Sequence, residues 1–321
     1  MNTPMKVTLL AGGVGGAKMA EGLAALPDVD LSIIGNVADD DAFHGLWVSP
    51  DIDTLTYSLA DVIDRTQGWG VADEGHRALQ TLSKLGAETW MTLGDRDFGL
   101  HIYRTMRRAK GDRPSDIARD VAKAFGVKPQ ILLPTDDVVQ TRVRTDEGWL
   151  SFQEYFVRER CSPEVRELAV HGLSDARPTP EALEAIAGAD LIVVAPSNPL
   201  VSIAPILDVP GIRAAVSDAA ALKVAVSPFI GGKVVKGPAD KMMKALGERP
   251  DALGVARRYA GFVDALMIDR VDAPLEADIR PEGLDILSSA TLMKSRDDKA
   301  RLASEIVDYA RAQQLETRIA S

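Results

Sequence analysis

The chain begins with a short apolar run, KVTLLA from Lys6 to Ala11, that leads directly into Gly12-Gly13-Val14-Gly15-Gly16-Ala17-Lys18. A buried run that is closed by glycines and followed by an amphipathic segment is the pattern of a strand, a tight turn and a helix. Glycines lack the Cβ atoms that keep an anion away from the backbone, so N–H groups at the start of the helix can reach phosphate oxygens. The turn therefore predicts phosphate binding, although a turn that only packs a helix closely against a strand has the same pattern.

The composition is that of a globular protein. The chain has 321 residues, of which 46% are hydrophobic and 26% charged, so it can bury a large core. Its formal net charge of −10 argues against binding nucleic acid through bulk electrostatics, and an anionic ligand must instead meet local cations and backbone N–H groups. The single cysteine, Cys161, excludes an internal disulfide. Because no apolar run approaches about 18 residues, we expect a cytoplasmic protein without a membrane span.

Apolar runs alternate with amphipathic segments, which favours an α/β fold with a parallel sheet and helices on both faces. Between about 95 and 170 the pattern predicts an inserted element of helices and an antiparallel hairpin around Asp146-Glu147-Gly148, within one domain over residues 1–321. The predicted strands are 31–35, 190–195, 223–226, 265–269 and 285–288, and the predicted helices are 55–63, 76–86, 98–110, 115–126, 180–187, 253–259 and 296–313.

An unusual density of acidic residues follows the second predicted strand, between residues 36 and 53. Asp is a common turn residue, so the cluster is consistent with a solvated loop. Carboxylates beside a phosphate site would repel the anion unless a divalent cation lies between them, which favours a metal site. Asp53 or Thr54 is the expected N-cap of the helix at 55–63. The polar residues of this segment include Asn36, Asp39, Asp40, Asp41, His44, Asp51 and Asp53.

Three later loops also carry polar or cationic residues. Gly94-Asp95-Arg96-Asp97 fits a ligand loop and equally a helix N-terminus that Asp97 caps. Pro196-Ser197-Asn198-Pro199 ends an almost wholly apolar strand, which is where parallel sheets bind ligands. The segment 227–241 contains Gly231-Gly232-Lys233 and two further lysines, which suit a polyphosphate, although a solvated face has the same pattern.

Together these loops resemble 2-phospho-L-lactate transferases of the CofD family. The resemblance extends from residue 9 to residue 243 and rests on LAGGVGGAK, NVADDDAFHG, SPDIDT, TLGDRD, APSNP and SPFIGGKVVKGPADKMM. Proteins of this family transfer a phosphoester-linked three-carbon acid from a guanylyl pyrophosphate donor to the deazaflavin Fo, releasing GMP, in coenzyme F420 biosynthesis. The resemblance implies a Rossmann-like fold, magnesium dependence and a homodimer.

The resemblance also implies roles for individual residues. Asp39 and Asp51 match the family's magnesium ligands, and Asp53 matches an aspartate beside Fo that could orient or deprotonate the attacking hydroxyl. The residues implied to hold the guanylyl pyrophosphate are Gly12, Gly13, Gly15, Gly16, Asn36, Ser197, Asn198, Gly231, Gly232 and Lys233, and those implied to bind Fo are Asp53, Thr92, Asp95, Arg96 and Asp97.

Two other functions fit parts of the pattern. CofD-like regulatory proteins share the glycine turn and bind nucleotide-linked metabolites without a transfer, but they lack the deazaflavin loop, which this chain has as TLGDRD. An NAD-dependent oxidoreductase would place an acidic residue at the end of the second strand, where this chain has Asn36. The transferase is therefore favoured.

The chain departs from the family's usual motif at one place, where Phe98-Gly99-Leu100-His101 stands instead of Leu-Ala-Thr-His. No residue of the sequence selects among a phospholactyl, a phosphoenolpyruvyl and a phosphoglyceryl donor.

Overall fold

A computed structural model describes residues 3–320, with side chains to residue 316. Its centre is a seven-stranded sheet in which every pair of neighbouring strands is parallel. The predicted Rossmann-like α/β fold is confirmed. In their order across the sheet, the strands are β14 (Asp285–Ser289), β13 (Ala265–Asp269), β10 (Leu222–Val226), β9 (Leu191–Val194), β1 (Met5–Ala11), β2 (Val29–Gly35) and β5 (Gln130–Leu132).

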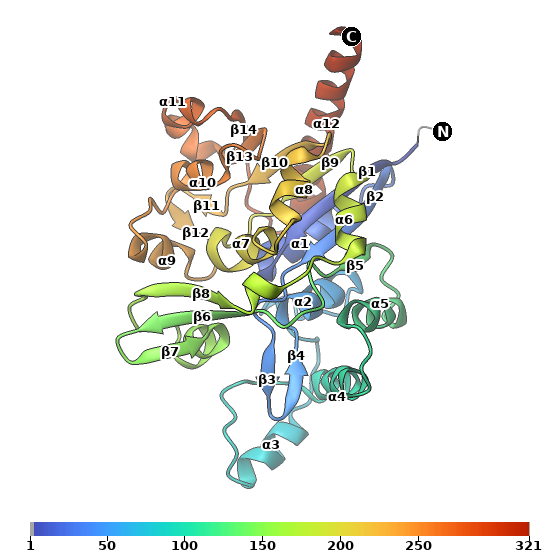
Figure 1. Ribbon diagram of the computed structural model, residues 1–321, viewed down its shortest axis with the longest axis vertical. Helices are drawn as coiled ribbons and strands as arrows, with labels where there is room; N and C mark the ends of the chain where they lie inside the picture. Colours follow the sequence, from blue (N-terminus) through green and yellow to red (C-terminus); the bar gives the residue numbers. More distant parts are fainter. Residues whose placement is uncertain (1–2, 321) are drawn as a thin grey trace.

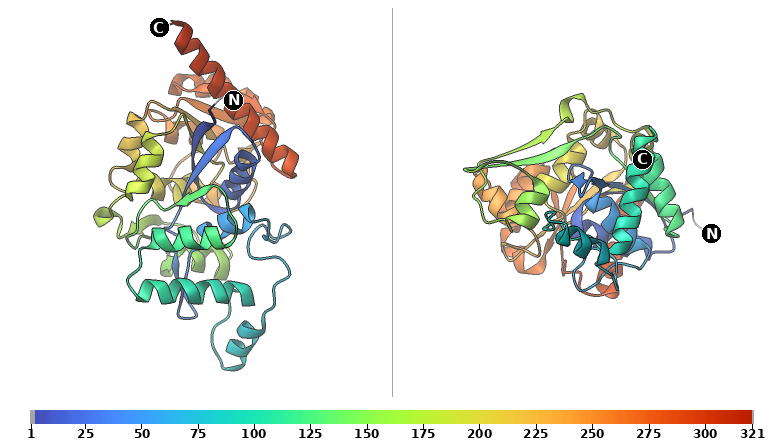
Figure 2. Two further views of the ribbon diagram at one scale, coloured as in Figure 1. Left: turned by 90° about the vertical axis from the view of Figure 1, so that its right-hand side faces the viewer. Right: turned by 90° about the horizontal axis from the view of Figure 1, so that it is seen from below.

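Helices cover both faces of this sheet, as the left view of Figure 2 shows. The strand β9 is buried at every position, which explains why its sequence is apolar without alternation. On one face lie α1 (Gly13–Ala24), α2 (Pro50–Leu59) and α12 (Arg296–Ala320), and on the other lie α6 (Pro180–Ala187), α7 (Ala204–Leu207) and α8 (Ile212–Asp218).

Smaller elements surround the sheet (Figure 1). The additional strands are the hairpin β3 (Asp41–Phe43) and β4 (Leu46–Val48), the antiparallel sheet of β6 (Gln140–Thr145), β7 (Gly148–Ser151) and β8 (Glu167–His171), and the pair β11 (Phe229–Ile230) and β12 (Lys233–Val234). The additional α-helices are α3 (Arg77–Lys84), α4 (Asp95–Ala109), α5 (Pro114–Ala124), α9 (Ala239–Ala245), α10 (Ala252–Tyr259) and α11 (Glu276–Ile279). Short π-helices are η1 (Glu154–Arg158) and η3 (Pro199–Ile203), and short 3-10 helices are η2 (Leu173–Asp175), η4 (Arg270–Leu275) and η5 (Arg280–Glu282).

The helix α2 differs from its prediction. It begins at Pro50 after the N-cap residue Ser49, so neither Asp53 nor Thr54 is its cap. Proline is favoured at the first helical position because its missing N–H would be unpaired there in any case. Asp51 and Asp53 lie instead in the first turn, where carboxylates interact favourably with the helix dipole. Two aspartates that seemed to belong to a loop are therefore fixed on a helix.

The inserted region contains both predicted and unpredicted elements. The hairpin is confirmed as β6–β7, but its second strand ends at Ser151 and residues 154–158 form η1. The strand β8 adds a third strand to this sheet. Although β5 lies within residues 95–170, it belongs to the main sheet and not to the inserted element. The domain limits themselves stay a prediction. Residues 41–48, expected as loop, include the hairpin β3–β4.

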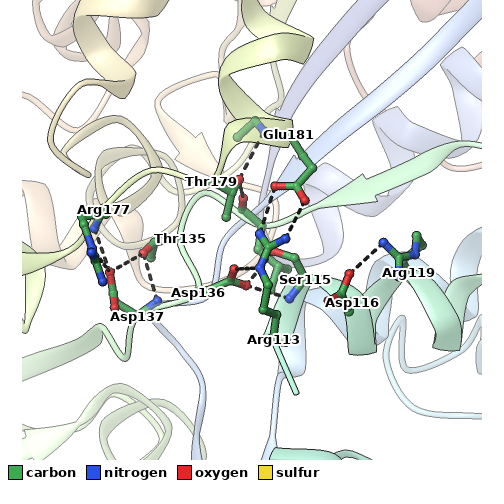
Figure 3. A network of polar contacts seen from close by, with 12 residues as sticks. Arg113, Ser115, Asp116, Arg119, Thr135, Asp136, Asp137, Arg177, Thr179 and Glu181 are labelled. Atoms are coloured by element: carbon green, nitrogen blue, oxygen red, sulfur yellow. Dashed lines mark hydrogen bonds and ion pairs between the residues drawn. The ribbon is translucent and has the colours of Figure 1, made fainter. Parts of the chain in front are cut away.

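A polar network fixes α5 to the neighbouring segments of the main sheet, as Figure 3 shows. Arg113 donates to Asp136 at 2.8 Å and to the carboxylate of Glu181 at 2.9 and 3.1 Å. Ser115 donates to Asp136 from both its N–H and its hydroxyl, at 2.7 Å each. The Thr179 hydroxyl, which caps α6, donates to Leu133 O at 2.6 Å. These bonds join α5, α6 and the segment after β5.

Between residues 3 and 320, no single helix is both long and apolar enough to cross a membrane. The consecutive helices Pro199–Leu207 and Ile212–Asp218 meet the length and composition criteria only as a pair, with a bend of 83° between them.

Candidate active site

A cavity of about 540 Å³ lies where β1, β9 and β10 end and α1 begins. Its walls come from the glycine turn, the acidic segment, the loop before α4 and the loops after β9 and β10. Parallel sheets bind ligands at this edge. Of the residues predicted for the site, the lining contains Gly12, Gly13, Gly15, Asp39, Asp51, Asp53, Thr92, Asp97, Ser197 and Asn198.

The start of α1 faces this cavity with backbone N–H groups that have no partner within the helix, of which that of Gly13 donates to the Asp51 carboxylate. Its first hydrogen bond within the helix runs from Gly16 N–H to Gly12 O at 3.3 Å, so the N–H groups of residues 13–15 point out of the helix end. Gly13 has a φ of +59° and open space where a side chain would begin. This position suits an anion, because the dipole of α1 adds a partial positive charge.

Other glycines of the turn are required by packing. A Cβ on Gly15 would lie 2.1 Å from the carbonyl oxygen of Pro196. A Cβ on Gly12 would lie 2.7 Å from the Cβ of Ser202, and Gly16 packs against the backbone of Ala11 outside the cavity lining. The turn therefore leaves room for an anion at Gly13, whereas Gly12, Gly15 and Gly16 are required for close packing.

The loop after β9 is fastened to the glycine turn. The Ser197 hydroxyl donates to Gly12 O at 2.7 Å, and Gly12 N–H approaches Ser197 Oγ at 3.3 Å. Asn198 caps η3 by accepting from Leu200 N–H at 2.9 Å. Ser197 and Asn198 therefore hold the shape of the loop and also line the cavity.

Asp39 and Asp51 form a buried acidic site beside the glycine turn. Asn36, directly after β2, donates from Nδ2 to Asp51 at 2.9 Å and lies outside the cavity lining. Burial, together with the charges of Asp51 and Asp40, raises the pKa of Asp39 well above its usual value. Burial also raises the pKa of Asp51, although the Asn36 amide and the Gly13 N–H oppose the increase.

This acidic site has the donor set of a magnesium site. Oδ1 of Asp39 is buried and has no hydrogen-bond partner among the described residues. Carboxylate oxygens are preferred Mg²⁺ ligands, and such sites commonly take one or two carboxylates and complete the shell with phosphate oxygens and water. In the described part of the chain, no group of three or more His, Cys, Asp and Glu is arranged to hold a metal. A cation here would therefore depend on a bound phosphate.

Asp53 forms a second acidic site, which contains its own cation. Its Oδ2 accepts from Arg104 Nη1 at 3.1 Å and its Oδ1 accepts from Arg104 Nη2. Arg104 comes from α4 and is only 5% exposed. His101, one turn earlier on α4, accepts at Nδ1 from Arg104 Nη1 at 3.1 Å and also lines the cavity. Burial, with the charge of Arg104, lowers the pKa of His101 despite the opposing effect of Asp53.

The TLGDRD segment divides into two parts. Thr92 and Asp97 line the cavity, and Asp97 accepts from the Tyr57 hydroxyl at 2.8 Å and from Gly94 N–H at 3.2 Å. Asp95 instead accepts from the N–H groups at the start of α3, and Arg96 donates to Ala72 O, both outside the cavity lining. The Asp97 carboxylate thus both stabilises the start of α4 and faces the cavity, whereas Asp95 and Arg96 connect α4 to the preceding segment.

Two lysines line the cavity, Lys18 and Lys236. Lys236 belongs to the lysine-rich segment that the sequence assigns to a polyphosphate, whereas Lys18 was not predicted as a ligand. Lys18 Nζ donates to Met293 O at 3.0 Å, and Lys236 Nζ donates to Gln67 O at 2.6 Å. Burial lowers the pKa of both lysines, with a contribution from a neighbouring lysine in each case. Because both follow glycines in predicted phosphate loops, their spacing could have identified them.

The structure places Gly231, Gly232 and Lys233 away from the cavity lining. They form the turn between β11 and β12 and the start of β12, and Gly231 N–H donates to the buried carboxylate of Asp272 at 2.9 Å. That donor already has an anionic partner from the chain itself.

An apolar wall completes the cavity. The inserted region contributes Phe152 and Phe156, whose rings stack at 5.6 Å with an interplanar angle of 5°, and Trp69 and Met91 come from earlier loops. No local pattern marks these residues, because they come from distant segments that only the tertiary fold brings together.

Comparisons with known proteins identify the family of this chain. The sequence model of the family 2-phospho-L-lactate transferase CofD matches residues 7–296. The 2-phospho-L-lactate transferase of Methanopyrus kandleri is 38% identical over 308 residues, covering 94% of this chain and 97% of the relative. The phosphoenolpyruvate transferase of Streptomyces griseus is 39% identical over 313 residues, covering 95% and 98%.

A crystal structure of protein BH3568 from Bacillus halodurans has the same fold. It is similar with a TM-score of 0.64 and 19% sequence identity, over 95% of this chain and all of the other. The family match spans nearly the whole sheet, including each strand end that contributes to the cavity. This chain is therefore a transferase that belongs to the 2-phospho-L-lactate transferase CofD family.

Proposed function

We propose that the protein transfers a phosphoester-linked three-carbon acid from a guanylyl pyrophosphate donor to the deazaflavin Fo and releases GMP, in coenzyme F420 biosynthesis. The observation that carries this proposal is one cavity that joins a helix N-terminus, two lysines, two buried acidic sites and an aromatic wall. The relatives are named for phospholactate and phosphoenolpyruvate, which supports a three-carbon acid as the transferred group.

The donor's pyrophosphate lies at the start of α1 in this proposal. The N–H groups of residues 14 and 15 meet its oxygens, and Lys18 and Lys236 offset its charge. Each lysine now donates to a backbone carbonyl, and a phosphate oxygen is a stronger acceptor because it is charged. We assign the cationic role of the 227–241 segment to Lys236, because Lys233 and the two glycines before it lie away from the cavity.

Mg²⁺ is the proposed cofactor, held by Asp39 and Asp51. When bound, it would neutralise charge on the pyrophosphate and on the leaving phosphate. The unpaired oxygen of Asp39 supports this assignment, because a buried carboxylate without a partner is costly unless a cation binds it.

Fo lies against the aromatic wall, with its ribityl chain directed toward Asp53, Thr92 and Asp97. Its terminal hydroxyl oxygen forms a bond to the β-phosphorus while the bond to the GMP oxygen breaks, and the hydroxyl proton is released. We assign Asp53 to orienting the hydroxyl rather than to taking its proton. Protonating Asp53 would leave the buried Arg104 cation without its partner.

The proposed assembly is a cytoplasmic homodimer, as the resemblance to the CofD family implies. Its partners are small molecules, and the net charge of −10 argues against nucleic acid. Sedimentation velocity with and without GDP measures the oligomeric state directly.

The test of the reaction is incubation of the protein with Fo, Mg²⁺ and a mixture of phospholactyl, phosphoenolpyruvyl and phosphoglyceryl donors. We expect GMP release that requires Fo, with the product mass identifying the acid. Omission of Fo and replacement of Mg²⁺ by a chelator are the controls. GDP binding without GMP release from any donor would support a non-catalytic nucleotide-binding protein instead.

A further inference from the structure

We propose that Arg104 is the positioning residue for Asp53, and that together with His101 it fixes the carboxylate at the angle needed to orient the acceptor hydroxyl. The proposal rests on the proposed function, since it concerns how the acceptor end of that site is held. The CofD resemblance implies no role for Arg104, which follows the TLGDRD segment by seven residues.

The contact between Arg104 and Asp53 joins two helices across the floor of the cavity. Asp53 lies in the first turn of α2, and Arg104 lies in the interior of α4, 51 residues later. Asp53 is 4% and Arg104 5% exposed, so bulk water does not weaken their interaction. Asp53 lines the cavity, whereas Arg104 does not. Arg104 therefore acts on a bound acceptor only through Asp53 and His101.

The geometry restricts the carboxylate more than an ordinary ion pair would. Each of the two Arg104 terminal nitrogens donates to a different oxygen of Asp53. Such a paired arrangement fixes both the distance and the plane of the carboxylate, which a lysine ammonium cannot do. The remaining lone pairs of the Asp53 oxygens can still accept a hydroxyl from the cavity.

His101 extends this arrangement to the cavity surface. An arginine can only donate, so the 3.1 Å contact makes His101 Nδ1 the acceptor and leaves its ring proton on Nε2. His101 lines the cavity with a ring whose Nδ1 is fixed by Arg104, so the N–H at Nε2 is the ring donor that remains for a ligand. The carboxylate of Asp53 and the ring of His101 are thus oriented by one guanidinium.

A purely structural role for Arg104 is the competing explanation, since the same contact fastens α2 to α4. Misplacing a catalytic group by about 1 Å can lower turnover on the order of 100-fold without loss of the fold, whereas a structural tether affects mainly stability. The two roles are separated by comparing turnover per folded molecule with melting temperature.

The experiment uses Arg104→Lys and Arg104→Ala in the full-length protein, with Arg107→Lys as the matched control. Arg107 lies one turn later on α4 and pairs with Asp112 and Asp120 away from the cavity. The measurements are melting temperature, GDP affinity by calorimetry, and kcat and KM for Fo. Millimolar guanidinium is added to Arg104→Ala as a chemical replacement for the missing group.

We expect both Arg104 variants to bind GDP normally and to lose kcat on the order of 100-fold, while Arg107→Lys keeps wild-type kcat. Guanidinium should restore part of the Arg104→Ala turnover and none of the Asp53→Asn turnover. Wild-type kcat in Arg104→Lys at any melting temperature would overturn the proposal, and so would a loss of GDP affinity equal to the loss of kcat.

If Arg104→Ala does not fold, Arg104→Lys decides alone, because it keeps the charge and changes only the geometry of the pair. If the wild-type protein releases no GMP, the proposed function fails; if the wild type is active and Arg104→Lys is equally active, only the positioning role fails.

Discussion

Two buried acidic sites share one turn of α2, and they differ in what neutralises them. Asp53 has a guanidinium bound to both of its oxygens. Asp51, two residues earlier, has an amide from Asn36, and its neighbour Asp39 keeps an oxygen with no partner among the described residues. Burying a charge is costly unless it is paired. The Asp53 site therefore contains its cation, whereas in our proposal the site of Asp39 and Asp51 takes one from outside.

This difference shows that equal residue types in adjacent positions can have unlike chemistry. A carboxylate without a partner is suited to bind a metal ion. The pKa values of Asp39 and Asp51 are raised because burial disfavours the charged form of each carboxyl group. A carboxylate held by arginine is suited to accept a hydrogen bond at a defined angle.

The largest effect is expected on activity from Asp39→Asn and Asp51→Asn. Each removes a charged oxygen from the proposed Mg²⁺ site, so turnover at limiting Mg²⁺ should fall by about 100-fold or more. Steady-state rates over a range of Mg²⁺ concentrations measure the effect, with partial recovery at high Mg²⁺. Asp41→Asn, a neighbouring aspartate outside the cavity lining, is the matched control. Wild-type rates in both variants at limiting Mg²⁺ would remove the metal from this site.

The second prediction concerns stability and has opposite signs at the two sites. Asp53→Asn leaves Arg104 buried without its partner, so the free energy of unfolding should fall by about 3–5 kcal/mol. Asp39→Asn removes a buried carboxyl group that burial and neighbouring carboxylates disfavour when it is ionised, so it should raise the melting temperature of the protein in the presence of a chelator. Denaturant unfolding of both variants in parallel measures this contrast. A similar loss of stability in both would mean that the two sites do not differ as described.

The sequence predicted the parallel sheet, the turn after β1 and an acidic segment after β2, because apolar period and turn chemistry are local properties. It missed the hairpin β3–β4 and the true start of α2, since aspartates favour turns and helix starts alike. The Ser49-Pro50 pair was the available signal for that start.

The contacts that assign roles could not be predicted from local pattern. Arg104 lies 51 residues from Asp53 on an unremarkable amphipathic helix, and Phe152 and Phe156, which follow β7, share the cavity wall with Trp69 and Met91 from much earlier loops. Such contacts depend on how α2, α4 and the inserted region pack, which no spacing rule contains. The motif resemblance named many of the residues that line the cavity but not the partners that distinguish them.

The third prediction separates packing from anion binding in the glycine turn beside Asp51. Gly15→Ala should destabilise the fold by about 1–3 kcal/mol, because its Cβ would collide with the Pro196 carbonyl at 2.1 Å. Gly13→Ala has open space and a φ of +59°, so about 1–2 kcal/mol of backbone strain is expected at the anion site itself. Melting temperature and GDP affinity are measured for both variants. For an equal loss of stability, Gly13→Ala should lose more GDP affinity than Gly15→Ala. The reverse ranking would make the turn a packing element only.

The smallest effect is a pH dependence that only the site of Asp39 and Asp51 should produce. Both pKa values are raised, so between the ordinary carboxyl range and the raised values the folded protein binds more protons than the unfolded chain. With a chelator, the contribution of these groups to stability should therefore decrease as pH rises through that window. Mg²⁺ binds the deprotonated carboxylates, so the stabilisation by Mg²⁺ should increase over the same window.

Melting temperatures from about pH 5 to about pH 8, with Mg²⁺ and with chelator, measure the two opposite trends. Asp51→Asn is the informative comparison, because it removes one titrating group and should flatten both curves. Arg104→Lys should leave the Mg²⁺-dependent difference unchanged, since Asp53 carries its own cation and takes no part in metal binding. If the Mg²⁺ effect were independent of pH, or if Arg104→Lys abolished it, the two acidic sites would have to be treated as one.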